Sequence, residues 1–116
     1  MEGILDRSVY MFDLFRKENN KAIHVNDMDP LIGKVELIDI REPYEYSSGS
    51  LRTAKNIPMG ELLDHPEKYL KKGETYYLLC RSGSRSNNTC KVLDKLGYDV
   101  VNVSGGMISY IGTKRS

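Results

Sequence analysis

One stretch of the chain decides the fold, and it reads Tyr76-Tyr77-Leu78-Leu79-Cys80-Arg81-Ser82-Gly83-Ser84-Arg85-Ser86. An apolar run typical of a buried strand ends at Cys80, and a short loop of small residues leads into a segment with helical patterning. Such a strand, loop and helix direct several backbone N–H groups and the positive end of the helix dipole into one concavity. A thiol in that concavity is stabilised as a thiolate, and Arg81 and Arg85 add positive charge beside it. The stretch therefore predicts a cysteine nucleophile.

Strand-like and helix-like segments alternate along the chain around this stretch. The predicted strands are residues 23–25, 35–40, 54–57, 75–79 and 99–103. The predicted helices are residues 26–32, 42–48, 61–70, 86–96 and 107–110, with Pro66 able to split the third and Gly97 ending the fourth. This alternation predicts an α/β fold in which a parallel sheet carries helices on both faces.

Two loops are placed to bind a ligand. In parallel α/β folds, ligands bind beyond the carboxyl ends of the strands. Cys80 follows one predicted strand, and Ser104-Gly105-Gly106 follows another. We therefore expect these two loops to line one pocket.

The composition argues against several classes of protein. The chain has 116 residues, which suits one domain, and its net charge of +1 predicts neither a nucleic-acid nor a membrane partner. Charged residues interrupt the N-terminal apolar positions, unlike a signal peptide, and no stretch reaches transmembrane length. We therefore expect a cytoplasmic protein with free thiols at Cys80 and Cys90. These cysteines, His24 and His65 match no zinc spacing, so we expect no metal or other cofactor.

Cys80 has a structural alternative, in which it is a small apolar residue that closes a buried strand. Its neighbours favour catalysis, because a packing residue needs neither two arginines nor a glycine and several serines. No histidine is placed to act as its base, so activation would come from the loop itself. The spacing from Cys80 to Arg85 is C-x4-R, one residue shorter than the C-x5-R of tyrosine phosphatases and their arsenate-reducing relatives. The shorter cradle suits a sulfur atom bound to the cysteine, and a cysteine phosphatase or arsenate reductase is the less favoured alternative.

Four groups of residues identify a family by their order and spacing: residues 37–46 (LIDIREPYEY), 49–51 (GSL) with 54–58 (AKNIP), 80–86 (CRSGSRS), and 97–100 (GYDV) with 105–107 (GGM). Through them the chain resembles the single-domain rhodaneses, the thiosulfate sulfurtransferase family, over residues 22–112. The resemblance implies an α/β fold with a five-stranded, mainly parallel sheet and a cysteine that carries sulfane sulfur as a persulfide. Residues 1–21 would be an N-terminal extension, either a native arm or a remnant of cloning, and residues 113–116 a C-terminal tail.

Some segments depart from the family pattern. The family usually has Gly-His-Ile followed by a Pro-Gly-Ala segment, whereas this chain has Gly49-Ser50-Leu51 and Arg52-Thr53-Ala54. A tryptophan often follows the Gly-Gly pair in the family, and the nearest aromatic residue here is Tyr110. Because these departures lie outside the cysteine loop, they concern the surface and the partners rather than the chemistry.

The resemblance implies a two-step transfer through Cys80. Its thiolate would attack thiosulfate or another sulfane donor, and the persulfide would pass its sulfur to cyanide or a thiol, with a sulfur-carrying protein as a further candidate partner. Backbone N–H groups of residues 81–86 would hold the outer sulfur. We expect Arg81 to contact the anionic donor and Arg85 to be more structural. The other candidate binding residues are Ser82, Gly83, Ser84 and Ser86, the last of which is alternatively a helix cap.

Several interpretations stay open beside this one. The domain could be a relay that takes persulfide from a partner protein, or a non-catalytic binding module, although such a module would be expected to lack the cysteine. Asp39 and Arg41 either shape the pocket rim or pair to hold the fold, which is the commoner role of charges near a sheet end. Glu45 could tie its short helix to the loops. Cys90 either packs against the sheet or resolves oxidised Cys80 through a disulfide, and its place on the helix favours packing.

Overall fold

The computed structural model describes residues 21–116, so the predictions for residues 1–20 lie outside the described residues. The strands are β2 (Lys21–His24), β3 (Glu36–Asp39), β4 (Lys55–Asn56), β5 (Thr75–Leu79) and β6 (Asp99–Ser104). The helices are η1 (Val25–Asp27), η2 (Asp29–Leu31), α2 (Pro43–Ser47), α3 (Met59–Asp64), α4 (Pro66–Tyr69), α5 (Ser84–Lys95) and α6 (Gly106–Ser109). Among these helices there is none with the length and apolar character needed to cross a membrane.

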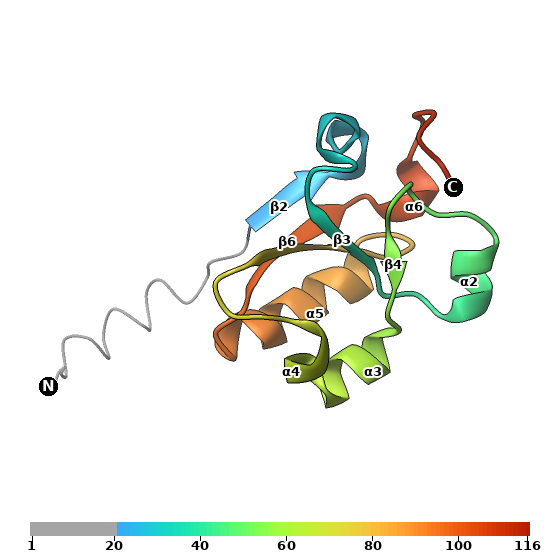
Figure 1. Cartoon of the computed structure of the whole chain (residues 1–116). Coiled ribbons are helices and arrows are strands. Elements are labelled where there is room, and N and C mark those ends of the chain that lie inside the picture. Colours follow the sequence, from blue (N-terminus) through green and yellow to red (C-terminus); the bar gives the residue numbers. More distant parts are fainter. Residues whose placement is uncertain (1–20) are drawn as a thin grey trace, which may run out of the picture.

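The strands form one five-stranded sheet in the order β2-β6-β5-β3-β4 (Figure 1). Every neighbouring pair is parallel. β5 lies at the centre, where Leu78 pairs with Ile38 of β3 on one side and with Asn102 of β6 on the other. The predicted α/β fold is confirmed, and the sheet is parallel throughout. Cys80 therefore follows the central strand at the carboxyl edge of the sheet.

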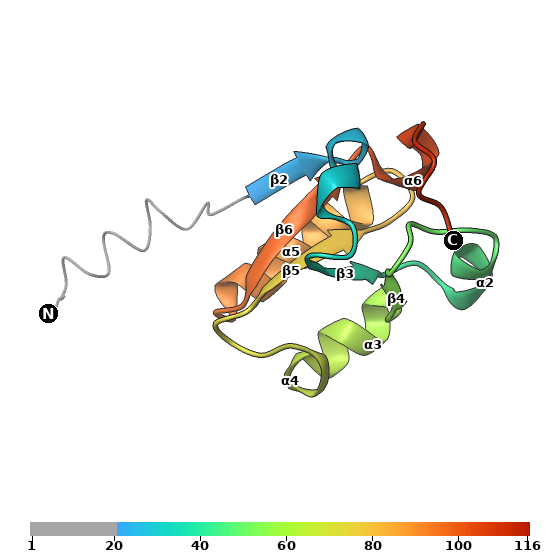
Figure 2. The same cartoon turned by 45° about the horizontal axis from the view of Figure 1, so that its top comes forward.

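Helices cover both faces of the sheet (Figure 2). Side chains of a strand point alternately to its two faces, so β5 contributes to two cores. Tyr76 and Leu78 pack in the core beneath α3, α4 and α5, which also contains Cys80. Tyr77 and Leu79 pack in the core on the other face, with residues of η1 and α6. Burial on both faces explains why residues 76–79 of this strand are all apolar or aromatic.

Three of the expected helices differ clearly from the sequence expectation. Residues 26–32, expected to be one helix, lie within the two short 3-10 turns η1 and η2 and the residues after them, and Pro30 in η2 has no N–H to continue a longer helix. Pro66 divides residues 61–70 into α3 and α4, because proline has no N–H to continue the first helix and His65 before it has φ −138°. Helix α5 begins at Ser84, because Gly83 takes the N-cap position with φ +95°. Ser86 is therefore inside the helix, and its interpretation as a helix cap is wrong.

The end of the chain packs against the segment that follows α2. Arg115 forms an isolated antiparallel bridge with Leu51, and the backbone N–H of Arg52 donates to Lys114 O at 2.9 Å. The backbone N–H of Ser116 donates to Ser50 O at 2.9 Å. The segment expected to be a C-terminal tail thus adds hydrogen bonds to the fold.

The loop after β5 packs directly on the turn after β6. The backbone N–H of Met107 donates to Cys80 O, and that of Ile108 donates to Arg81 O, each at 2.9 Å. Gly106, at φ +64°, lies so close that a Cβ there would be 2.3 Å from Arg81 O. No side chain fits at this position, so the approach of the two loops depends on Gly106.

Gly106→Ala should destabilise the protein strongly. A non-glycine residue at positive φ costs about 1–2 kcal/mol, and forcing a methyl group against the backbone adds about 1–3 kcal/mol. Gly33→Ala is the matched control, because Gly33 has φ +90° but a Cβ at that position would meet no atom within 4 Å. Urea unfolding measures both losses. If the two variants lose the same free energy of unfolding, the close contact with Arg81 has no part in stability.

Candidate active site

The sulfur of Cys80 lies at the N-terminus of α5. The residue is 1% exposed, and its Sγ accepts the backbone N–H groups of Gly83 at 3.1 Å and Ser86 at 3.3 Å. Ser86 Oγ lies 3.2 Å from the same sulfur. The N–H groups of Ser84 and Arg85, in the first turn of α5, have no carbonyl partner within the helix. The sulfur is thus surrounded by fixed hydrogen-bond donors.

Gly83 allows the loop to turn back over the sulfur. Its φ of +95° is in the left-handed region, which glycine adopts without a steric penalty. A Cβ at Gly83 would also lie 3.0 Å from the backbone nitrogen of Gly105. The loop can therefore aim its N–H groups at Sγ only because two glycines from different turns pack closely together.

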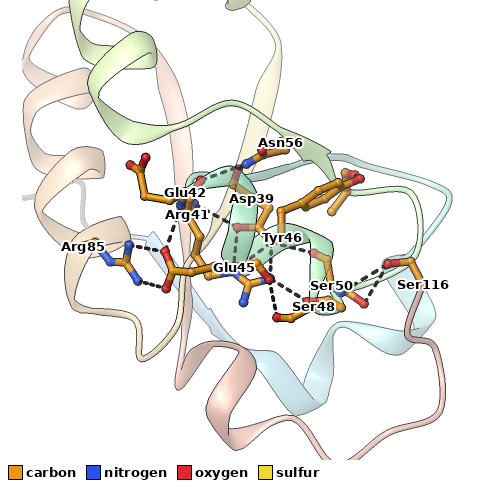
Figure 3. Close-up of polar contacts among 12 residues, drawn as sticks. Asp39, Arg41, Glu42, Glu45, Tyr46, Ser48, Ser50, Asn56, Arg85 and Ser116 are labelled. Carbon is orange, nitrogen blue, oxygen red and sulfur yellow. Dashed lines mark hydrogen bonds and ion pairs between the residues drawn. The ribbon is translucent and has the colours of Figure 1, made fainter.

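The two arginines of the loop have different surroundings. The Arg85 guanidinium donates to both carboxylate oxygens of Glu45, at 2.9 Å each, and so joins α5 to α2 (Figure 3). Arg85 lowers the pKa of Glu45 from 4.5 to about 2, and Glu45 in turn raises the pKa of Arg85. Arg81 is exposed, and within residues 21–116 its guanidinium forms no ion pair. Arg81 is therefore the arginine whose charge is available to a ligand.

The three predicted serines also differ in their surroundings. Ser86 is buried and touches Sγ through both its N–H and its hydroxyl. Ser82 and Ser84 are exposed, and among residues 21–116 no hydrogen bond joins either hydroxyl to Sγ. Of the predicted loop residues, the structure brings Gly83 and Ser86 onto the sulfur.

Asp39 and Arg41 form a buried ion pair near the end of β3. Arg41 donates to Asp39 through Nε and a terminal guanidinium nitrogen, the latter at 2.7 Å, and the same terminal nitrogen donates to Gly49 O at 2.7 Å (Figure 3). Ser50 Oγ donates to Asp39 Oδ2 at 2.7 Å, and Asn56 Nδ2 donates to Asp39 O at 3.0 Å. These contacts join β3, β4 and the segment after α2. Of the two roles that the sequence allowed, shaping the pocket rim or pairing to hold the fold, the contacts fit the second.

Asn102 is a residue of this site that the sequence reasoning missed. It lies on β6, is 7% exposed, and its Oδ1 accepts a hydrogen bond from the Ser86 hydroxyl. The signal in the sequence was a lone amide inside the apolar run Val100-Val101-Asn102-Val103. A polar side chain at the centre of a buried strand needs a partner, and that partner here belongs to the cysteine loop.

The second cysteine and the histidines lie apart from the sulfur contacts. Cys90 is 7% exposed on α5, and burial raises its pKa to about 12, so it stays protonated near neutral pH. This favours packing over a resolving role. His24 is exposed at the end of β2, with Nε2 beside the Gly105 turn, and His65 is exposed between α3 and α4. Neither histidine is hydrogen-bonded to Cys80 within the described residues.

Comparison with known proteins identifies the family. The family model for the rhodanese-like domain matches residues 19–112. The chain belongs to the rhodanese-like domain family. The resemblance seen in the sequence is confirmed, and the five-stranded parallel sheet is this chain's version of the rhodanese-like fold.

Relatives and solved structures agree with this assignment. The protein named "Putative sulfurtransferase YtwF" of Bacillus subtilis (strain 168) is 46% identical over 78 residues, which cover 66% of this chain and 73% of that protein. A protein of Allochromatium vinosum named "Sulfurtransferase" is 36% identical over 77 residues, covering 66% and 71% of the two chains. The crystal structure of a rhodanese-like domain protein from Staphylococcus aureus matches with a TM-score of 0.74 at 30% identity, over 83% of this chain and 96% of that one.

The ion pair between Glu45 and Arg85 should give stability a specific pH dependence. Because the pKa of Glu45 falls from 4.5 to about 2 on folding, its ionised form stabilises the protein fully above about pH 4.5 and loses this effect as the pH falls towards 2. We expect a loss of about 1–2 kcal/mol, since solvent screens the Arg85 side chain, which is 36% exposed.

Glu45→Gln should remove this part of the acid dependence, as measured by urea unfolding at a series of pH values. The exposed Glu67 provides the control, because Glu67→Gln should leave the pH curve close to that of the unchanged protein. An unaltered curve in Glu45→Gln would show that the ion pair does not contribute to stability.

Proposed function

We propose that this chain is a sulfurtransferase that carries sulfane sulfur as a persulfide on Cys80. The observation that supports it most is the pair of backbone N–H groups, from Gly83 and Ser86, directed at Sγ from 3.1 and 3.3 Å. Fixed donors of this kind stabilise negative charge on sulfur without having to reorganise. Membership of the rhodanese-like family, with relatives named as sulfurtransferases, is an independent support.

In the first step, the Cys80 thiolate attacks the outer sulfur of thiosulfate. A bond forms between Sγ and that sulfur, the S–S bond of thiosulfate breaks, and sulfite leaves with the electron pair. The terminal sulfur of the persulfide then carries the negative charge. The N–H groups of Ser84 and Arg85, which α5 does not use internally, are the donors we assign to it.

In the second step, cyanide or a thiolate attacks the terminal sulfur. A new bond forms to that sulfur, its bond to Sγ breaks, and the electron pair returns to Sγ. The products are thiocyanate or a new persulfide, together with the original Cys80 thiolate. The cycle consumes no cofactor and needs no general base, since the acceptor reacts as an anion.

Arg81 is the residue we assign to the anionic donor. Its side chain is exposed, and it has no ion-pair partner within the described residues, whereas the Arg85 guanidinium is held by Glu45. A guanidinium binds an oxyanion through paired hydrogen bonds, which suits the sulfonate end of thiosulfate. Arg81 would therefore position the donor while the loop binds the transferred sulfur.

A relay between proteins is the alternative within the same chemistry, since it uses the same loop and differs in the donor. A cysteine phosphatase or arsenate reductase is disfavoured by the short C-x4-R loop. The compartment we propose is the reducing cytoplasm, where Cys80 and Cys90 would stay as the free thiols they are in the structure.

Incubation with thiosulfate should add one sulfur atom to Cys80, and cyanide should remove it as thiocyanate. Intact-protein and peptide mass spectrometry measure the addition. Cys80→Ser should gain nothing, whereas Cys90→Ala should gain sulfur as the unchanged protein does. A protein loaded by an organic persulfide but not by thiosulfate would be a relay. Hydrolysis of an aryl phosphate, with no sulfur gained from either donor, would refute the proposed function.

Arg81→Ala should raise the KM for thiosulfate at least tenfold, because it removes a charge-assisted contact worth about 1.5–3 kcal/mol. Steady-state thiocyanate formation gives the KM, and thermal unfolding checks that the variant is folded. Arg81→Lys is the control, since it keeps the charge and should recover part of the affinity. If Arg81→Ala has an unchanged KM, the donor is bound by the loop alone.

A further inference from the structure

Asn102 is a buried amide in a strand that is otherwise apolar at its centre. Val100, Val101 and Val103 surround it in sequence, and Asn102 itself is 7% exposed. Its Oδ1 accepts the Ser86 hydroxyl, and within residues 21–116 no group accepts a hydrogen bond from its Nδ2. A buried amide with an unpaired N–H is costly, and an unpaired N–H is rarer in proteins than an unpaired carbonyl oxygen. The surroundings of Asn102 therefore favour an orientation in which Nδ2 finds a partner.

The Ser86 hydroxyl has a single proton and three neighbours that can accept it. Cys80 Sγ lies at 3.2 Å, Gly83 O also lies at 3.2 Å, and Asn102 Oδ1 is the third. A thiolate and a carbonyl oxygen can only accept hydrogen bonds. Asn102 alone can change from acceptor to donor, because a half-turn of its amide places Nδ2 where Oδ1 was.

We propose that Asn102 is a positioning residue that donates an N–H to Ser86 Oγ and so directs the Ser86 proton onto Cys80 Sγ. This orientation pairs the buried Nδ2 and removes Asn102 as a competitor for the proton. Gly83 O remains as the other acceptor, at the same 3.2 Å as Sγ, but a negatively charged sulfur accepts the hydrogen bond more strongly than a neutral carbonyl oxygen. The resulting chain runs from Asn102 Nδ2–H to Ser86 Oγ and from Ser86 Oγ–H to Sγ. It adds a side-chain donor to the two backbone donors that already face the sulfur.

The inference rests on the proposed function in one respect, that Cys80 is the nucleophile. In that cycle Sγ carries negative charge twice, as the attacking thiolate and as the leaving group. A donor on Sγ stabilises both states, whereas Asn102 touches neither the sulfur donor nor the acceptor. Asn102 should therefore influence the rate of each step and leave the KM for thiosulfate unchanged.

The other ionisable groups near the sulfur would not explain a change in Cys80 reactivity when Asn102 is substituted. The Arg85 guanidinium is paired with Glu45, and Cys90 stays protonated near neutral pH because burial raises its pKa to about 12. Arg81, the remaining charge of the loop, is exposed. Substitution of Asn102 leaves all of these groups in place, so a change in Cys80 reactivity can be ascribed to the hydrogen-bond chain.

The test is the rate at which iodoacetamide alkylates Cys80 at neutral pH, a reaction that needs no sulfur donor. Asn102→Leu removes the amide while filling its space, and Ser86→Ala removes the hydroxyl. Each should slow alkylation about tenfold, the effect of losing one hydrogen bond to a charged sulfur. In a Ser86→Ala background, Asn102→Leu should have no further effect, because Asn102 acts through Ser86. Peptide mass spectrometry assigns the reaction to Cys80, and circular dichroism verifies the fold.

Asn102→Asp is the second variant, with the same shape and no N–H, and it is decisive if Asn102→Leu does not fold. It should slow alkylation at least as much. An unchanged rate in a folded Asn102 variant, or equal slowing with and without the Ser86 hydroxyl, would overturn the inference. If the unchanged protein transfers no sulfur while the variants show the expected alkylation rates, the proposed function is refuted and the role of Asn102 stands.

Discussion

Two backbone N–H groups directed at one sulfur atom are the constraint around which this structure is arranged. Gly83 and Ser86 can aim at Cys80 Sγ only if the loop turns sharply and α5 starts at once. That turn needs a glycine at positive φ, and it needs Gly106 to let the neighbouring turn approach. The central position of β5 in a parallel sheet then fixes the loop from both sides. The surroundings of this thiol are thus a product of backbone geometry.

The charged residues around this edge of the sheet divide into those that join segments of the fold and one that faces solvent. The buried pair of Asp39 and Arg41 joins β3 to the segment after α2. Glu45 and Arg85 join α2 to α5. Both ion pairs are hydrogen-bonded on more than one side, as partly buried charges require. Arg81 alone among these residues leaves its charge exposed, so the anion recognition proposed for Arg81 would rest on a different side chain from those that stabilise the fold.

The sequence predicted what depends on local pattern. The apolar run before Cys80 indicated the central strand, Pro66 marked a break between helices, and the C-x4-R spacing with its flanking segments indicated the family. Contacts between segments that are distant in the sequence could not be predicted from local patterns. The start of α5 was misjudged because it depends on Gly83 packing against another turn, and Asn102 was missed because its partner Ser86 is 16 residues away in the sequence.

The burial of Cys80 has a consequence for how partners would recognise this protein. At 1% exposure, the thiol itself presents almost no surface to another molecule. A sulfur atom attached to it would extend outward by one S–S bond, about 2 Å. On the proposed function, the sulfur-loaded and the unloaded forms would then differ mainly in whether a transferable sulfur atom lies beyond the buried thiol. An acceptor could distinguish the two by contact alone, without any movement of the fold.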